Sequence, residues 1–423
     1  MTKIYTSRTN FLFVIMMLML IFQDWISQKV SFWKYFDEGL AVCLFFVVVA
    51  DRIYRRNYKY TQFDLYVGVS ILIYWFSTTM SSLFFGFQPL TIALKASFLG
   101  MKWFIVFWST KYICSRLEEA TWKSTSRIVH ELTIIFGIVE NWYWIHNIKH
   151  VFDRYKYCNA LTPMYLCAVN VMLLAFLFIE WRGKKLDWLS LGLLLENLIF
   201  STKAKGYGAA LLAILLFVWI IKMKRQIKLH HIVIMGIACV CLVWEKVYFY
   251  YIYASAPDHD YARYRLTATG FQILKDYFPF GTGWGTWGSY YSSVNYSPVY
   301  YLYGIDQHRE LGVLTRMYIM DSYLASVMGE SGFLGLLMIM IFMLSLFIVA
   351  NKLYKVDNRV YAAGLLCIFY LCITFVEETG FANPALMGIA LMMGRIVSIW
   401  EKSCINTRQD YNHVKENVRK KKT

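Results

Sequence analysis

Long apolar stretches recur along the whole chain and set the strongest limit on how it can fold. About twelve of them approach the ~20 residues that a helix needs to cross a lipid bilayer. They cover residues 10–27, 38–54, 63–83, 89–111, 128–145, 159–181, 186–202, 206–222, 232–250, 331–350, 360–377 and 383–400. Lipid offers the backbone no hydrogen-bond partners, and a helix satisfies its own amides and carbonyls. The sequence therefore predicts an all-α polytopic membrane protein, with residues 1–423 in a single integral membrane domain.

The composition agrees with a membrane protein. Charged residues make up only 17% of the chain, whereas a soluble domain has about 25%. The nine cysteines form no Cys-x-x-Cys pair and show no metal-ligand spacing. We therefore expect neither a disulfide framework nor a zinc site.

The distribution of lysine and arginine predicts how the chain is oriented. With the N-terminus in the cytoplasm, the cytoplasmic segments carry 27 of these residues and the opposite segments carry 12. Cytoplasmic loops of membrane proteins are enriched in both residue types. We therefore expect both termini in the cytoplasm. The same bias explains most of the net charge of +16 without a nucleic-acid partner.

One predicted extracytoplasmic loop, residues 251–330, is far longer than any other connection. Long ordered loops are usually functional. Apolar residues recur at helical spacing between residues 264 and 278, which predicts an amphipathic helix on the membrane surface, ended by Pro279. Arg263 and Arg265 stand near the start of this helix. They would suit an anionic ligand held with backbone amides, or they contact lipid phosphates.

The middle of this loop is an uncharged run rich in glycine and aromatic residues, GTGWGTWGSYYSSVNYSPVYYLYG, over residues 281–304. It fits the pattern Gly-x-Gly-x-x-Gly of dinucleotide-binding folds. That fold requires a strand before the glycines and a helix after them, and neither is expected here. Uncharged aromatic and hydroxyl side chains suit a neutral sugar, and they equally suit a membrane interface. Trp284, Trp287 and Tyr290 are the candidate sugar-binding residues.

The end of the loop is dense in titratable side chains. His308 has a near-neutral unperturbed pKa and could accept a proton. Asp321 precedes an apolar segment, so it is either a helix N-cap or a functional carboxylate. Glu330 begins the next predicted span and either binds substrate or marks the membrane interface.

A basic turn, STKAKG at residues 201–206, lies on the same predicted side as the loop. Lys203 and Lys205 there run against the charge bias of the other turns. They would grip a phosphate, or they extend toward the interface as snorkelling lysines. Acidic residues in or near other spans keep a proton- or ion-coupled transporter open as an alternative. They are Glu131, Glu140, Glu196, Glu245, Glu377 and Glu378.

Four motifs between residues 200 and 340 together resemble those of the bacterial O-antigen polymerase/ligase superfamily. The first two are the basic turn and the pair Arg263-Tyr-Arg265. The third is Phe278-Pro-Phe-Gly281-Thr-Gly283-Trp-Gly285-Thr-Trp287, similar to the family's Pro-x-Gly-x-Gly-x-Gly-x-Phe. The fourth is Asp321-Ser-Tyr-Leu with Glu330-Ser-Gly332-Phe-Leu-Gly335, similar to the family's His-Asn-x-x-Leu and Glu-x-Gly-x-x-Gly. The family often has serine-arginine where this chain has Lys203 or Lys205, and histidine where it has Asp321. Ligases use that histidine, so its replacement favours a polymerase.

The resemblance implies a GT-C-like helical glycosyltransferase in the bacterial cytoplasmic membrane. Its donor would be an oligosaccharide linked to undecaprenyl diphosphate, and its acceptor a sugar hydroxyl of a second lipid-linked unit. Inversion is expected, without metal or other cofactor. A chain-length regulator and a flippase are expected partners beside the lipid bilayer. A ligase using another acceptor, or a flippase or other transporter of lipid-linked sugars, remains the alternative.

The resemblance also gives the candidate residues roles. Cations would stabilise the charge that develops on the leaving diphosphate, and a carboxylate or imidazole would orient or deprotonate the hydroxyl. The catalytic candidates are Arg263, Arg265, Asp321 and His308. The substrate-binding candidates are Lys203, Lys205, Trp284, Trp287, Tyr290 and Glu330.

Overall fold

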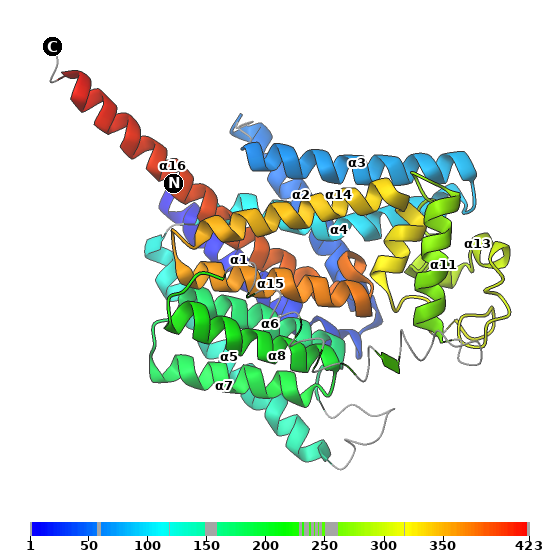
Figure 1. Ribbon diagram of the computed structural model, residues 1–423. Helices are drawn as coiled ribbons and strands as arrows, with labels where there is room; N and C mark the ends of the chain where they lie inside the picture. The colour runs from blue at the N-terminus through cyan, green and yellow to red at the C-terminus, as the bar shows by residue number, and fades with distance from the viewer. Residues whose placement is uncertain are drawn as a thin grey trace.

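The computed structural model describes residues 2–56, 61–117, 119–148, 159–227, 261–316 and 318–420, with a few single positions between 231 and 249. These residues form helices joined by turns, and no strand occurs among them (Figure 1). The all-α prediction is therefore confirmed for the described part of the chain.

The long helices are α1 (Thr2–Ser27), α2 (Phe36–Tyr54), α3 (Gln62–Phe85), α4 (Leu90–Cys114), α5 (Glu119–Asn147), α6 (Pro163–Glu180), α7 (Lys185–Phe200), α8 (Ala204–Leu216), α11 (Ala262–Asp276), α14 (Tyr323–Leu353), α15 (Asn358–Glu377) and α16 (Met387–Lys420). Shorter elements are η1 (Ser31–Tyr35), the π-helical η3 (Phe217–Lys222), α12 (Tyr290–Val294), α13 (Pro298–Leu302), η6 (Gly380–Ala382) and η7 (Pro384–Leu386). Helix α14 packs along α3, and α16 packs along α4.

Within the described residues, 8 helices are long and apolar enough to cross a membrane. They correspond to the predicted spans in α1, α3, α4, α6, α8 with η3, α14, α15 and α16. Three further predicted spans coincide with helices that are more polar (α2 and α5) or shorter, with 16 residues in α7. The predicted span 232–250 falls largely outside the described residues. The chain is therefore a polytopic membrane protein, and the predicted number of twelve spans stays a prediction.

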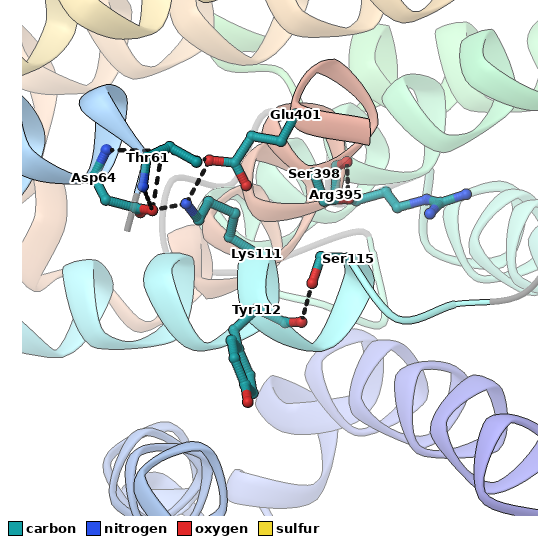
Figure 2. Close-up of polar contacts among 8 residues, drawn as sticks. All are labelled: Thr61, Asp64, Lys111, Tyr112, Ser115, Arg395, Ser398 and Glu401. Atoms are coloured by element: carbon teal, nitrogen blue, oxygen red, sulfur yellow. Dashed lines mark hydrogen bonds and ion pairs between the residues drawn. The ribbon is translucent and has the colours of Figure 1, made fainter. Parts of the chain in front are cut away.

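The segments predicted to be cytoplasmic come together at one end of the bundle. Lys111 of α4 forms ion pairs with Asp64 at the start of α3 and, at 2.8 Å, with Glu401 of α16, as Figure 2 shows. The Thr61 hydroxyl donates to Glu401 at 2.8 Å and also caps α3. These contacts join three helices whose ends the charge distribution predicts to lie on one side.

The described part of the long loop covers the opposite end of the bundle and has a small core of its own (Figure 1). Its helix α11 confirms the helical segment expected before Pro279, and it packs against α14. Trp287 and Tyr300 are completely buried in this core, with ring centroids 4.9 Å apart. The loop is thus a folded layer on the membrane helices.

The glycine run lies against a break in α14. This helix begins at Tyr323, before the predicted span start at residue 331, and its backbone leaves helical geometry at Gly332 (φ 62°, ψ −158°). Gly283 N donates to Glu330 O at 2.8 Å beside this break. Gly283 itself has φ +99°, and a Cβ on it would stand 2.6 Å from Ser82 Cα of α3. The glycines therefore let the loop backbone contact two helices directly, which side chains would prevent.

Candidate functional site

A cavity of about 710 Å³ lies where the loop meets the membrane helices. Its walls come from η1, α2, α3, α4, the turn before α8, the start of α11, the glycine run, the start of α14 and the turn after α15. Five basic side chains line it: Lys34, Lys102, Lys203, Lys205 and Arg263. Four acidic side chains do so as well: Glu38, Asp321, Glu330 and Glu378.

The basic turn between α7 and α8 places Lys203 and Lys205 on this cavity. The turn is tight, because a Cβ on Gly206 would stand 2.5 Å from Leu198 O at the end of α7. The Lys205 side chain is buried and forms an ion pair with Glu378. Glu378 in turn accepts a hydrogen bond from the Asn383 side chain at 2.7 Å. Lys205 is thus held by the turn that follows α15.

Arg263 and Asp321 meet across the cavity wall. Arg263, in the first turn of α11, donates from Nη2 to Asp321 Oδ2 at 3.3 Å. Asp321 is not the N-cap of α14, because the hydroxyl of Ser322 accepts from Ala325 N in that role. The N-cap interpretation of Asp321 is therefore wrong, and this carboxylate lies beside a guanidinium on the cavity.

A second charged cluster on the cavity was missed by the sequence analysis. Lys102 lies within the apolar helix α4 and is completely buried. Its ammonium group forms an ion pair with Asp37 of α2 and lies 3.6 Å from Glu38. Gln23 of α1 also donates to Asp37, at 2.9 Å. Charged residues inside spans usually mark functional or cavity-lining positions, so a lysine in an apolar run was the available signal.

Aromatic side chains form another part of the cavity wall. Trp284 is held in place, since its backbone amide donates to Ser82 Oγ at 2.7 Å and its indole donates to Thr79 Oγ1 at 3.0 Å. Tyr290 lines the cavity and remains 47% exposed. Burial raises the pKa of neighbouring Tyr291 above its ordinary value, so its phenol stays neutral. This wall offers uncharged rings and hydroxyls.

Three of the predicted site residues do not line the cavity. Trp287 packs in the core of the loop instead. His308 Nδ1 accepts hydrogen bonds from the backbone amides of Glu310 and Leu311, at 3.0 and 3.2 Å, and so shapes a turn. Arg265 follows Arg263 on α11, but its side chain is not part of the cavity wall.

Glu330 lines the cavity from the last turn before the break in α14. Its side chain is buried, and Oε1 accepts a hydrogen bond from Trp287 N at 3.3 Å. Its backbone carbonyl accepts from Gly283 N at 2.8 Å. Glu330 therefore joins the glycine run to α14. The third and fourth of the four motifs that resemble the family, the glycine motif and the motif that contains Glu330, thus contact each other.

The site has no arrangement typical of a metal centre in the part of the chain that the structure describes, where no three His, Cys, Asp or Glu side chains are grouped to hold an ion. No known protein family matches the chain, and no curated protein is significantly similar to it. Fold and site together define a polytopic helical membrane protein with a large charged cavity beneath one long loop.

Proposed function

We propose that this protein is a polysaccharide polymerase of the O-antigen, capsule or exopolysaccharide type. It joins oligosaccharide repeat units carried on undecaprenyl diphosphate, at the outer face of the bacterial cytoplasmic membrane. One observation carries the proposal: the basic turn, the α11 arginine, Asp321 and the aromatic run line a single cavity. These are the motifs on which the resemblance to polymerases rests, and they come from distant parts of the sequence.

The cations of the cavity suit a diphosphate leaving group. Lys205 and Arg263 each face one carboxylate, Glu378 and Asp321 respectively. A diphosphate carries more negative charge than either carboxylate and would compete for the same donors. Charge on it grows as the bond to the sugar breaks, so these cations stabilise the transition state more than the bound donor.

In this proposal Asp321 acts on the acceptor. The hydroxyl oxygen of the acceptor sugar attacks the anomeric carbon, and its proton passes to the Asp321 carboxylate. The bond from that carbon to the diphosphate oxygen breaks, and lipid diphosphate leaves. A single displacement of this kind inverts the anomeric configuration.

The size of the cavity agrees with this chemistry. Sites for small molecules usually measure about 300–1,000 Å³, and this cavity has about 710 Å³. It accommodates the reacting sugars with their phosphates, while the lipid tails stay in the bilayer and the polymer extends outside. The exposed ring of Tyr290 suits a sugar ring, whereas Trp284, at 3% exposure, contributes mainly packing to this wall.

The alternative of a lipid-linked-sugar transporter has one observation in its favour, the buried pair of Lys102 and Asp37 inside the bundle. Transporters use such intramembrane charges along their pathways. The folded loop and its aromatic wall have no evident use in transport, so we favour the polymerase.

The test is polymer formation from purified lipid-linked repeat unit by the full-length protein in detergent. Polymer formed without any other acceptor supports the polymerase. Transfer that requires a different acceptor indicates a ligase, and movement of the lipid across vesicles without a new glycosidic bond indicates a transporter. The Asp321→Asn variant should bind the donor normally and turn over at least about a hundredfold more slowly. Normal turnover in that variant would remove Asp321 from the mechanism.

A further inference from the structure

A second cavity, of about 600 Å³, lies at the end of the bundle opposite the loop. It is lined by the end of η3 and the turn after it, the residues between α14 and α15, and Trp181 at the end of α6. Each of these helices runs from the loop end toward this end or starts here, so the cavity is separate from the candidate catalytic site. The charge distribution predicts that this end faces the cytoplasm.

The second cavity is strongly basic. Four of its lining residues are cations and one, Asp357, is an acid. Asp357 is fully engaged by Arg359, which donates to it from Nη2 at 2.6 Å and from its backbone amide at 2.8 Å. The cavity's three lysines, Lys222, Lys224 and Lys355, form no ion pair with any carboxylate in the described part of the chain. Within the described residues, these three positive charges are therefore not neutralised by a carboxylate.

The backbone around these lysines is fixed by contacts between separate helices. Lys224 adopts a left-handed conformation with φ +53°, and its carbonyl accepts a hydrogen bond from the Tyr354 hydroxyl at 3.0 Å. Arg359 donates from Nη1 to the Trp181 carbonyl, also at 3.0 Å. Lys222 Nζ lies 4.5 Å from the centre of the Trp188 ring. The backbone at Lys224 and the side chains of Lys222 and Arg359 thus have defined contacts beside the cavity.

We propose that this cavity binds a phosphate group. Two sources share that chemistry, the headgroup of an anionic phospholipid and a soluble phosphate compound of the cytoplasm. The position favours the headgroup, because the cavity lies among the ends of membrane helices, where tryptophan and tyrosine meet the interface. Basic pockets between helices on the cytoplasmic side hold anionic headgroups in this way. The inference does not depend on the proposed polymerase activity.

The experiment uses full-length protein stripped of lipid in a neutral detergent. Native mass spectrometry would measure its occupancy by phosphatidylglycerol and, in a second arm, by phosphatidylcholine. A third arm would measure the shift in thermal unfolding caused by inorganic phosphate or pyrophosphate. The variant is Lys224→Gln with Lys355→Gln. The matched control, Lys185→Gln with Lys352→Gln, removes two charges from the same end without touching the cavity.

We expect the variant to bind phosphatidylglycerol more weakly by about fivefold for each lysine removed, while the control retains its affinity. Preference for phosphatidylglycerol over phosphatidylcholine, with no effect of soluble phosphate, identifies a lipid headgroup. Stabilisation by phosphate or pyrophosphate that the variant loses identifies a soluble ligand. Equal behaviour of the variant and the control with every probe would overturn the proposal.

Discussion

Lys205, which is buried, and Arg263, which is partly exposed, illustrate how much depends on the partner of a cation in the cavity wall. Each faces a carboxylate across the cavity, and removing either cation leaves that carboxylate without its principal counter-charge. A loss of activity on substitution therefore needs a control for simple disruption of the fold. Arg265 supplies it, since it lies two residues after Arg263 on α11 and outside the cavity wall.

The variants Lys205→Ala and Arg263→Ala should each lower the rate of polymer formation by about a hundred- to a thousandfold, because in the proposed mechanism each removes a donor that stabilises the leaving diphosphate. Arg265→Ala should stay near the normal rate. The measurement is the initial rate with purified lipid-linked repeat unit, at equal amounts of folded protein. A loss in Arg265→Ala as large as that in Arg263→Ala would mean that the arginines stabilise α11 rather than bind substrate.

The basic turn, Arg263, Asp321 and Glu330 could be selected from the sequence because their residue types are unusual beside apolar spans. Their partners could not be selected in the same way. Glu378 was one of several acidic residues near spans, and nothing in the sequence joins it to Lys205. The pair of Lys102 and Asp37 combines two helices that are not adjacent in the chain, so only the packing of α2 on α4 reveals it.

At the scale of elements, some side chains of the aromatic run line the cavity and others pack in the core of the loop. Tyr290 is 47% exposed on the cavity, whereas Trp287 is completely buried. Tyr290→Ala should therefore lower polymer yield at an unchanged unfolding temperature.

Trp287→Ala should lower stability instead, by about 3–5 kcal/mol, the usual cost of emptying a core site of this size. Thermal unfolding and activity measured on the same preparations check both, and an unchanged unfolding temperature for Trp287→Ala would contradict the core assignment.

The close approach of Gly283 to α3 gives a second prediction for elements. In Gly283→Ala, the new Cβ meets α3 at 2.6 Å, and the positive φ adds strain. We expect a loss of stability of about 2–5 kcal/mol from the clash and the left-handed backbone together. Gly304→Ala is the matched control, with a similar φ of +65° and nothing within 4 Å. Equal unfolding temperatures for the two variants would show that the close approach contributes nothing.

The hydropathy pattern did not predict where α14 begins. The apolar run begins at residue 331, but the helix begins at Tyr323 and is broken at Gly332. The earlier turns contain Ser326 and Glu330, which are polar because they face the cavity and the loop. Hydropathy identifies segments that face lipid, and it misses a helical turn whose surroundings are protein.

At the scale of the whole molecule, the structure brings together the segments that the charge distribution assigned to one side. Asp51 and Arg116 form an ion pair, and Lys402 donates to Leu117 O at 2.7 Å. The loop lies at the other end (Figure 1). Which helix ends lie together at one end of the bundle was thus predictable from the positions of lysine and arginine alone. The number of twelve spans stays a prediction, since α2, α5 and α7 are not among the 8 described helices that are long and apolar enough to cross a membrane.

This arrangement predicts the outcome of topology mapping. A reporter fused after Tyr303 should be extracytoplasmic, and reporters fused after Arg56, Arg225 or Lys355 should be cytoplasmic. Phosphatase and fluorescent-protein fusions at each position distinguish an extracytoplasmic reporter from a cytoplasmic one. A cytoplasmic reading after Tyr303 would place the candidate site on the wrong face for lipid-linked sugars awaiting polymerisation.

The buried pair of Lys102 and Asp37 also bears on how the protein is made. A lysine at the centre of a helix costs about 2.5–3.5 kcal/mol when that helix enters the bilayer alone. Helix α2, which carries Asp37, precedes α4 in the chain, so the counter-charge is synthesised before Lys102. Asp37 is meanwhile the acceptor of a hydrogen bond from Gln23 of the still earlier α1. We expect α4 to enter the bilayer together with α1 and α2, before any residue of the long loop has been translated.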